Sequence, residues 1–284
     1  MGLKNKSLIE VHIAVFLFGL AGLFGKLLYL PPMIIVLGRV VFSSIFLFFI
    51  MHILKKDIKL KEKKHYFYLI LMGIILAIHW STFFKSIQVS TVAIGLITFS
   101  TFPVFVILLE PYFFKEKIKF TDILTCLITF FGVVLVVPEF QLGNNLTQGI
   151  LYGIVSGFTY AVLSIINRKY VKEYSGMIIA FYEQFVATIV LIPFLFIQKP
   201  VFQFKDILLL ILLGTVFTGI AHSIFITSLK GIKTKTAAII SCLEPVYGII
   251  FAAILLKEIP TLKEILGGII ILGTVFYSTI SNNS

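Results

Sequence analysis

Residues 243–258, LEPVYGIIFAAILLKE, and residues 101–116, TFPVFVILLEPYFFKE, follow one pattern at a displacement of 142 positions. In each stretch a Pro-Val pair precedes an apolar run, and a Lys-Glu pair closes it. Long apolar runs with few charges are typical of helices that cross a membrane. The two stretches therefore indicate a membrane-embedded structural unit that occurs twice in the chain.

Other matches keep nearly the same displacement and the same order along the chain. They are Phe83 on Phe225, Ser86 on Ser228 and, at a displacement of 144, residues 33–35 on residues 177–179. Single matches are weak evidence in apolar sequence, but their common displacement is informative. We therefore expect two repeats, residues 1–140 and residues 141–284.

The composition predicts an all-α integral membrane protein. Hydrophobic residues make up 59% of the 284 residues and charged residues 13%, whereas soluble domains are roughly 45–50% apolar and about 25% charged. Backbone polar groups in lipid must be hydrogen-bonded within the segment, so apolar runs of about 20 residues are expected to be helices. We expect ten such helices, at residues 8–29, 33–54, 66–87, 90–110, 122–138, 147–167, 177–197, 206–228, 236–256 and 262–280.

The basic residues predict the orientation of these helices. With both termini in the cytoplasm, 17 Lys and Arg residues fall on the inner side and 4 on the outer side. This is the asymmetry that cytoplasmic loops show, and it explains the net charge of +11 without a nucleic-acid partner. Each repeat holds an odd number of helices, so the second repeat is expected to be inverted relative to the first. Inverted repeats are typical of secondary transporters, although a duplicated scaffold without transport activity has the same pattern.

These residues also carry a resemblance to a known family. Each half has a proline-containing fourth helix, a Lys-Glu pair eleven residues beyond the Pro-Val pair, and a glycine-containing last helix. The positions are residues 243–246, 257–258, 267–268 and Gly273 in the second half, and residues 103–104, 115–116 and Gly132 in the first; Arg39 and residues 79–85 fit as well. The chain resembles the EamA-like family of the drug/metabolite transporter superfamily. The resemblance implies two inverted five-helix repeats, a central cavity lined by the first four helices of each, and export of metabolites or amino acids.

Ionisable residues within predicted spans are candidates for the substrate cavity, because a charge in the bilayer is costly. Glu244 lies near the middle of its predicted helix and is expected to carry a proton or to bind a substrate ammonium group, unless it forms a structural ion pair. Phe102 stands at the equivalent position of the first repeat. Arg39 and Glu183 are equivalent at a displacement of 144 and carry opposite charges. We expect them near the two mouths of one cavity.

Further cavity candidates are polar or aromatic residues in the same helices. His79 and His222 lie near mid-membrane in equivalent helices, and Trp80 is the only Trp of the chain. The remaining candidates are two residues near the outer helix ends, Lys26 and Lys85, and three tyrosines, Tyr160, Tyr182 and Tyr247. For each, packing within the bundle is the alternative. Glycines at 149, 153 and 157, and at 19, 22 and 25, predict close helix contacts.

The sequence therefore predicts a secondary transporter of the inner (cytoplasmic) membrane that works by alternating access and exports a small metabolite such as an amino acid. Coupling to protons is an open alternative, as is a monomeric or homodimeric state. No catalytic set, cofactor motif or metal cluster is evident, and an intramembrane hydrolase would need a nucleophile with a base. A lipid or drug flippase of the same fold remains the main rival function.

Overall fold

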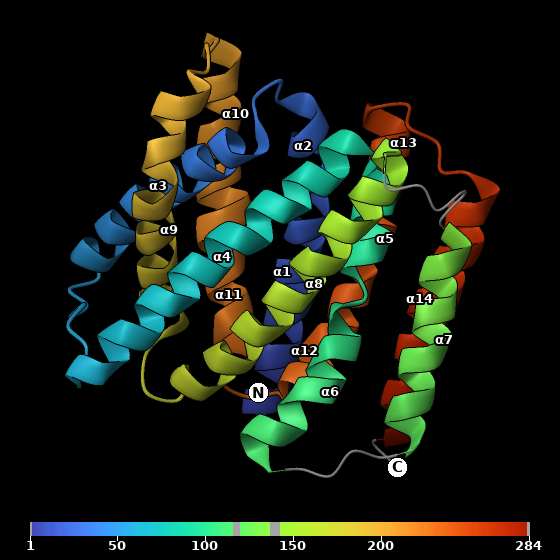
Figure 1. The fold of residues 1–284 in the computed structure, drawn as a ribbon. Coiled ribbons are helices and arrows are strands. Elements are labelled where there is room, and N and C mark those ends of the chain that lie inside the picture. The colour runs from blue at the N-terminus through green and yellow to red at the C-terminus, as the bar shows by residue number, and fades with distance from the viewer. Residues whose placement is uncertain (1, 116–119, 137–142, 283–284) are drawn as a thin grey trace.

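Helices account for nearly all of the computed structural model, which describes residues 2–115, 120–136 and 143–282 (Figure 1). No strand occurs among these residues. The helices of the first half are α1 (Leu3–Ala21), α2 (Phe24–Leu27), α3 (Pro32–Ile53), α4 (Lys63–Val89), α5 (Val92–Phe99), α6 (Phe102–Phe114) and α7 (Phe120–Val136). The second half holds α8 (Asn145–Tyr170), α9 (Gly176–Gln198), α10 (Phe204–Gly214), the π-helical turn η1 (Thr215–Ile220), α11 (Ala221–Ser228), α12 (Thr234–Ile240), the 3₁₀ turn η2 (Ser241–Leu243), α13 (Glu244–Leu255) and α14 (Leu262–Asn282).

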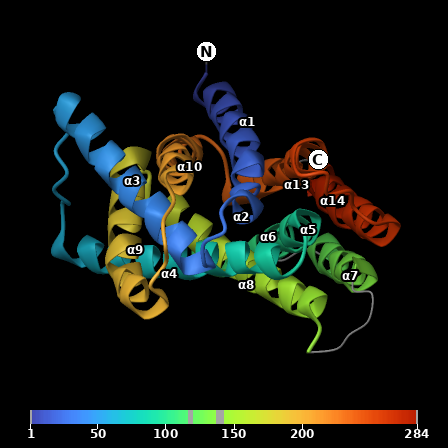
Figure 2. The same cartoon turned by 90° about the horizontal axis from the view of Figure 1, so that it is seen from above.

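Eight helical segments of the described chain are long and apolar enough to cross a membrane. They coincide with eight of the ten predicted runs; the two other runs correspond to α7, which has 17 residues, and α14. These two helices pack on each other at one edge of the molecule (Figures 1 and 2). The predicted boundary between the repeats, at residues 140 and 141, and Glu116 of the repeated motif lie outside the described residues.

Both proline motifs interrupt their helices. Pro103 lies in the first turn of α6, just after the break that separates α5 from α6, and Pro245 lies in the first turn of α13, just after η2. Proline has no N–H group, so it fits the first turn of a helix, where the N–H has no intrahelical partner, better than the interior. The predicted fourth helix of each half is therefore two shorter helices placed end to end, and Glu244 is the first residue of α13 rather than a mid-helix residue.

The first helix of each half packs on the broken helix of the other half. α1 contacts α13 and η2, and α8 contacts α5 and α6. Gly19 makes the first contact close, because a Cβ atom there would lie 2.8 Å from the backbone oxygen of Glu244. Gly157 makes the second close, because a Cβ atom there would lie 3.0 Å from the backbone oxygen of Phe99. The predicted role of the glycines in close helix packing is thus confirmed at these two positions.

Gly19→Ala is expected to destabilise the protein by about 1–3 kcal/mol, since the added methyl group cannot be accommodated without moving α1 away from α13. The measurement is the thermal unfolding midpoint of the purified protein in detergent. Gly273→Ala is the matched control, because Gly273 is an exposed helical residue with no atom within 4 Å of the added Cβ. Equal midpoints for the two variants would contradict the close contact.

Candidate functional site

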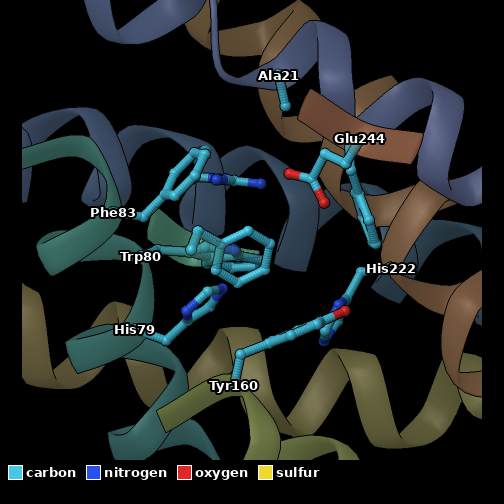
Figure 3. A pocket seen from close by; sticks show the side chains of 10 residues that line it. Ala21, His79, Trp80, Phe83, Tyr160, His222 and Glu244 are labelled. Atoms are coloured by element: carbon cyan, nitrogen blue, oxygen red, sulfur yellow. The ribbon is translucent and has the colours of Figure 1, made fainter. Parts of the chain in front are cut away.

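A closed cavity lies between the two halves of the chain (Figure 3). It contains about 350 Å³ of space between atoms, and the part wide enough for the centre of a water molecule is only about 20 Å³, room for about one water. Its walls come from α1, α3, α4, α5, α8, α11 and α13. The lining residues are Phe18, Ala21, Arg39, His79, Trp80, Phe83, Phe99, Tyr160, His222 and Glu244.

Six of the eleven predicted cavity residues therefore meet at this one place: Arg39, His79, Trp80, Tyr160, His222 and Glu244. They come from five different helices and from both halves of the chain. None of the ten lining side chains is more than 9% exposed. The side chains that line the cavity are thus buried within the protein in this conformation.

Arg39 is held in the wall by an aromatic ring and a hydroxyl group. Its guanidinium carbon lies 3.8 Å from the centroid of the Trp80 ring, and its Nε donates to Thr218 Oγ1 at 2.9 Å. Thr218 lies in the π-helical turn η1, and its own hydroxyl donates to the Leu213 carbonyl at 2.7 Å. Among the described residues, no carboxylate lies within 4 Å of the guanidinium. A cation–π contact in a desolvated site therefore holds this charge.

Glu244 presents a free carboxylate to the cavity. It begins α13, where the helix dipole favours a negative charge, and in Figure 3 its carboxylate points into the cavity. Its side chain is 5% exposed and has no hydrogen bond or ion pair with a described residue. A buried carboxylate without a partner is rare, because the desolvation penalty is not repaid. Glu244 is therefore available to bind a ligand.

Glu183 lies behind the cavity wall rather than in a mouth of the cavity. Its Oε2 lies 2.7 Å from His222 Nε2, and both side chains are at most 1% exposed. His222 lines the cavity and Glu183 does not. The structure thus separates Arg39 from Glu183: the cation faces the cavity directly, and the carboxylate reaches it only through the imidazole ring of His222.

Aromatic rings form the rest of the wall. His79 stacks on Tyr160 with ring centroids 4.7 Å apart, and its Nδ1 lies 2.9 Å from Ser156 Oγ and 3.0 Å from the Ser156 carbonyl oxygen. Trp80 meets the His222 ring edge-on at 5.4 Å. A flat or apolar part of a ligand would find complementary surfaces here.

The other four predicted cavity residues lie away from this cavity. Lys26 donates to the Ser90 carbonyl at 2.7 Å, at the end of α4, and Lys85 is half-buried near the same end. Tyr182 donates to the Ile58 carbonyl at 3.0 Å in the segment that joins α3 to α4. Tyr247 packs edge-on against Phe16 of α1, with ring centroids 5.3 Å apart.

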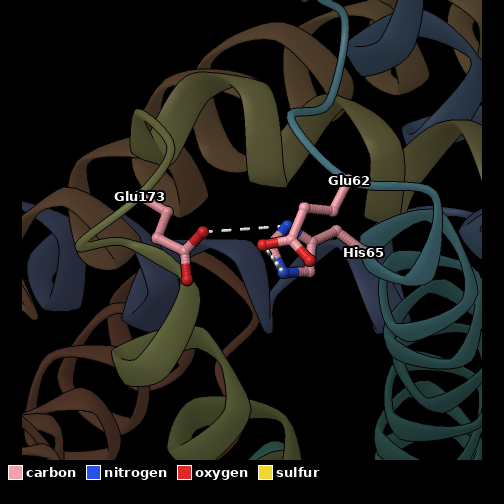
Figure 4. A group of neighbouring side chains, drawn as sticks. All are labelled: Glu62, His65 and Glu173. Atoms are coloured by element: carbon pink, nitrogen blue, oxygen red, sulfur yellow. Dashed lines mark ion pairs between the residues drawn. The ribbon is translucent and has the colours of Figure 1, made fainter.

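The structure also brings together three side chains of the types that bind metal ions, a cluster that was not predicted from the sequence. The side chains of Glu62, His65 and Glu173 bring one ligand atom each within 4.8 Å of one another (Figure 4). The two carboxylates approach different ring nitrogens of His65, at 3.9 Å from Nε2 and 3.7 Å from Nδ1, and Nδ1 lies 2.6 Å from the Tyr174 hydroxyl. Lys64 lies 2.6 Å from Glu62 and lowers the pKa of that carboxyl group by hydrogen bonding. Because the carboxylates lie at different nitrogens of one ring, this arrangement suits a contact between the start of α4 and the segment after α8 better than a shared metal ion.

Comparison with known proteins assigns the chain to a family. The model of the EamA-like transporter family matches residues 6–137 and again residues 147–280, which together cover most of the chain. This chain belongs to the EamA-like transporter family. It is similar to the uncharacterized transporter YxxF of Bacillus subtilis, with 26% identity over 94% of this chain and 88% of that protein.

Two further proteins are similar to this EamA-like transporter, one in sequence and one in structure. An S-adenosylmethionine uptake transporter of Rickettsia conorii is 25% identical, over 84% of this chain and 80% of its own. A protein of known crystal structure, 14% identical, superposes with a TM-score of 0.73 over 98% of both chains, which shows a shared fold. The family, fold and membrane segments thus agree that the chain is a multi-pass membrane transporter.

Trp80, the only Trp of the chain, reports directly on this cavity. It is 5% exposed, so we expect blue-shifted fluorescence that aqueous acrylamide does not quench. The control is Tyr29→Trp in a Trp80→Phe background, since Tyr29 is 96% exposed and its replacement should be quenched readily. Strong quenching of the wild-type protein would contradict the closed cavity.

Proposed function

We propose that this EamA-like transporter is a secondary transporter that moves a small zwitterionic metabolite, such as an amino acid, across the cytoplasmic membrane by alternating access. The observation that carries the proposal is the pair of opposite charges on one closed cavity: Arg39, stacked on Trp80, and the unpaired Glu244. An anionic group of the substrate would bind Arg39, and its ammonium group would bind Glu244. The aromatic wall would take the remainder of the substrate.

The S-adenosylmethionine uptake transporter among the similar proteins supports this substrate class. S-adenosylmethionine carries a carboxylate and an ammonium group, as an amino acid does, together with a sulfonium cation and a flat adenine ring. Arg39 would bind the carboxylate, Glu244 one of the cationic groups, and the aromatic wall the adenine ring. The direction proposed here, export, rests on the family resemblance.

Alternating access requires the cavity to open, because it holds about one water in the described conformation. Three interruptions of regular helix border it: the break between α5 and α6, the turn η2 before Glu244, and the π-helical turn η1 under Arg39. Interrupted helices are the usual place for binding sites and bending in transporters. The closed, charged cavity also suits a small polar solute better than the lipid substrate of a flippase.

The proposal includes ten membrane crossings in two inverted repeats with both termini in the cytoplasm. The contacts support an approximate two-fold relation: α1 packs on α13 as α8 packs on α6, while α3 pairs with α9 and α7 with α14. The start of α1 and the end of α14 lie at the same end of the molecule (Figure 1).

Only eight helical segments of the described chain are long and apolar enough to cross a membrane, and α7 is not one of them. Cysteine labelling tests whether α7 nevertheless crosses. Lys115→Cys and Asn144→Cys flank α7, so in a background without Cys126 and Cys242 they should react with a membrane-impermeant maleimide from opposite sides of the membrane. Labelling of both from the same side would show that α7 does not cross.

Glu244→Gln tests the substrate site. Loss of a charge-assisted contact of about 1.5–3 kcal/mol is expected to weaken binding about 10- to 100-fold. Candidate substrates come first from a thermal-shift screen of amino acids, nucleosides, nucleotides, cationic drugs and lipid head groups, and uptake is then measured in proteoliposomes.

The matched control is Glu264→Gln. Glu264 is also buried, but it accepts hydrogen bonds from Thr91 Oγ1 and Thr261 N–H away from the cavity. In the Gln variant the amide oxygen can accept from Thr261 N–H, and the amide nitrogen can donate to the Thr91 hydroxyl. The control should transport like the wild type. Full activity of a folded Glu244→Gln variant would refute the site, and retention of lipid head groups in the screen would favour the flippase function instead.

A further inference from the structure

Glu183 and His222 form a buried ionisable pair that the proposed substrate site does not use. Their side chains are 0% and 1% exposed, and the contact joins α9 to α11. The surrounding titratable groups come from the other elements of the cavity: His79 on α4, Arg39 on α3, Tyr160 on α8 and Glu244 on α13. His222 faces the cavity, so a change in its charge is felt by everything that binds there.

The pair is incompletely hydrogen-bonded. Within the described part of the chain, Glu183 Oε1 and His222 Nδ1 have no hydrogen-bond partner, although both are buried. A pair kept only for stability is expected to satisfy its remaining polar atoms, because each unsatisfied buried group costs about 1–3 kcal/mol. Orphaned atoms of this kind require an explanation, and exchange of a proton is one that an imidazole and a carboxylate can supply.

A second, wider cavity approaches the pair from the end of the molecule where α1 begins. It has a volume of about 400 Å³, and its lining includes Ser223, Thr227, Lys230, Lys56 and Glu10. Ser223 follows His222 directly on α11, and its hydroxyl is buried and without a partner in the described chain. Neighbouring residues of one helix therefore line two cavities: His222 the closed one and Ser223 the wide one, which we name the vestibule.

We propose that the Glu183–His222 pair is the site of the coupling proton, loaded from the vestibule and separate from the Glu244 substrate site. The inference rests on the proposed transport function and adds its energy coupling. A hydronium ion in the vestibule gives one proton to the neutral imidazole beside the Glu183 carboxylate and leaves as water. The pair then holds imidazolium and carboxylate, and it returns the proton to water when the cavity opens to the other side.

The geometry gives this proton a way to act on the substrate. His222 meets the edge of the Trp80 ring, whose face carries Arg39 at 3.8 Å. Protonation thus adds a positive charge on the side of the cavity where the substrate's anionic group would bind. Loading the pair and binding the substrate are coupled through this shared wall, so the proton and the substrate would cross in the same direction, and the substrate gradient rather than an inward proton gradient would drive export.

The first test separates coupling from binding in proteoliposomes loaded with a solute that the wild type transports. One coupled proton and an imposed gradient of about one pH unit support about tenfold accumulation, since that gradient is a tenfold difference in proton activity. Wild type should reach this value. Glu183→Gln should show no gradient-driven accumulation while it keeps exchange of labelled for unlabelled solute, which needs no net proton movement.

Glu244→Gln should instead weaken accumulation and exchange together, about 10- to 100-fold at low solute concentration, and Glu264→Gln should keep both. The inference is overturned if Glu183→Gln still accumulates solute in response to the pH gradient. It is also overturned if Glu244→Gln loses accumulation alone, because the coupling proton would then belong to Glu244.

The second test uses fluorescence and does not depend on any substrate. An imidazolium quenches a neighbouring indole more strongly than a neutral imidazole does, and Trp80 is the only indole. Titration of wild-type emission should show one protonation step, which His222→Phe abolishes and Glu183→Gln shifts. His79→Phe is the control for the other nearby histidine, whose ring centroid lies 6.2 Å from that of Trp80, and it should keep the step.

The two tests distinguish the failure of each proposal. Wild-type emission without a protonation step, or a step that survives in His222→Phe, overturns the proton site, even if the pair variants do not fold well enough for transport assays. A clear step together with no uptake or binding of any solute would refute the proposed transport function and leave the titrating pair in place.

Discussion

The contacts between the first helix of each half and the broken helix of the other half place the cavity. At Gly19 the backbone of α1 touches the start of α13, and at Gly157 the backbone of α8 touches the break between α5 and α6. Without side chains at these positions, the helix axes can approach closely enough for van der Waals packing to hold them in a lipid environment. Glu244 on one side and Tyr160 on the other are positioned by these same helices, so the binding groups depend on the packing of small residues.

The breaks in the helices at the two proline motifs are tolerated because they are packed inside the bundle. A proline within a helix leaves backbone groups without intrahelical partners, which in lipid would cost several kcal/mol each. Both breaks lie inside the bundle, where hydroxyl groups such as Thr98 and Ser241 hydrogen-bond to backbone carbonyls of the preceding turn. Irregular backbone at membrane depth is tolerated only where protein or a water-filled cavity surrounds it. The breaks are thus placed beside the cavity, next to the lining residues Phe99 and Glu244.

The sequence predicts the helical segments well because lipid imposes a simple rule on length and apolarity. It also identifies Arg39, Trp80, His79, His222 and Glu244, because polar groups are conspicuous in apolar runs. It fails for Phe18, Phe83 and Phe99, which are only three among 30 phenylalanines. In a membrane helix both faces are apolar, so periodicity does not tell which phenylalanine faces the protein interior. The π-helical turn that brings Thr218 under Arg39 has no sequence signal that differs from its neighbours.

The sequence also did not predict which side chains contact Arg39 and Glu183. Arg39 and Glu183 occupy equivalent positions in the repeat, and opposite charges invite the expectation of a common role. Each instead takes a partner of a different kind, an indole ring for Arg39 and an imidazole for Glu183. Neither residue forms an ion pair with Glu244, so this carboxylate has no partner within 4 Å among the described residues. The equivalent position in the first half is Phe102. Only the second half therefore has a carboxylate here that can bind a cation. In the proposed transport cycle, two nearly equivalent packings of the halves would let the cavity face either side, and the unequal charges of Arg39 and Glu244 would select the substrate.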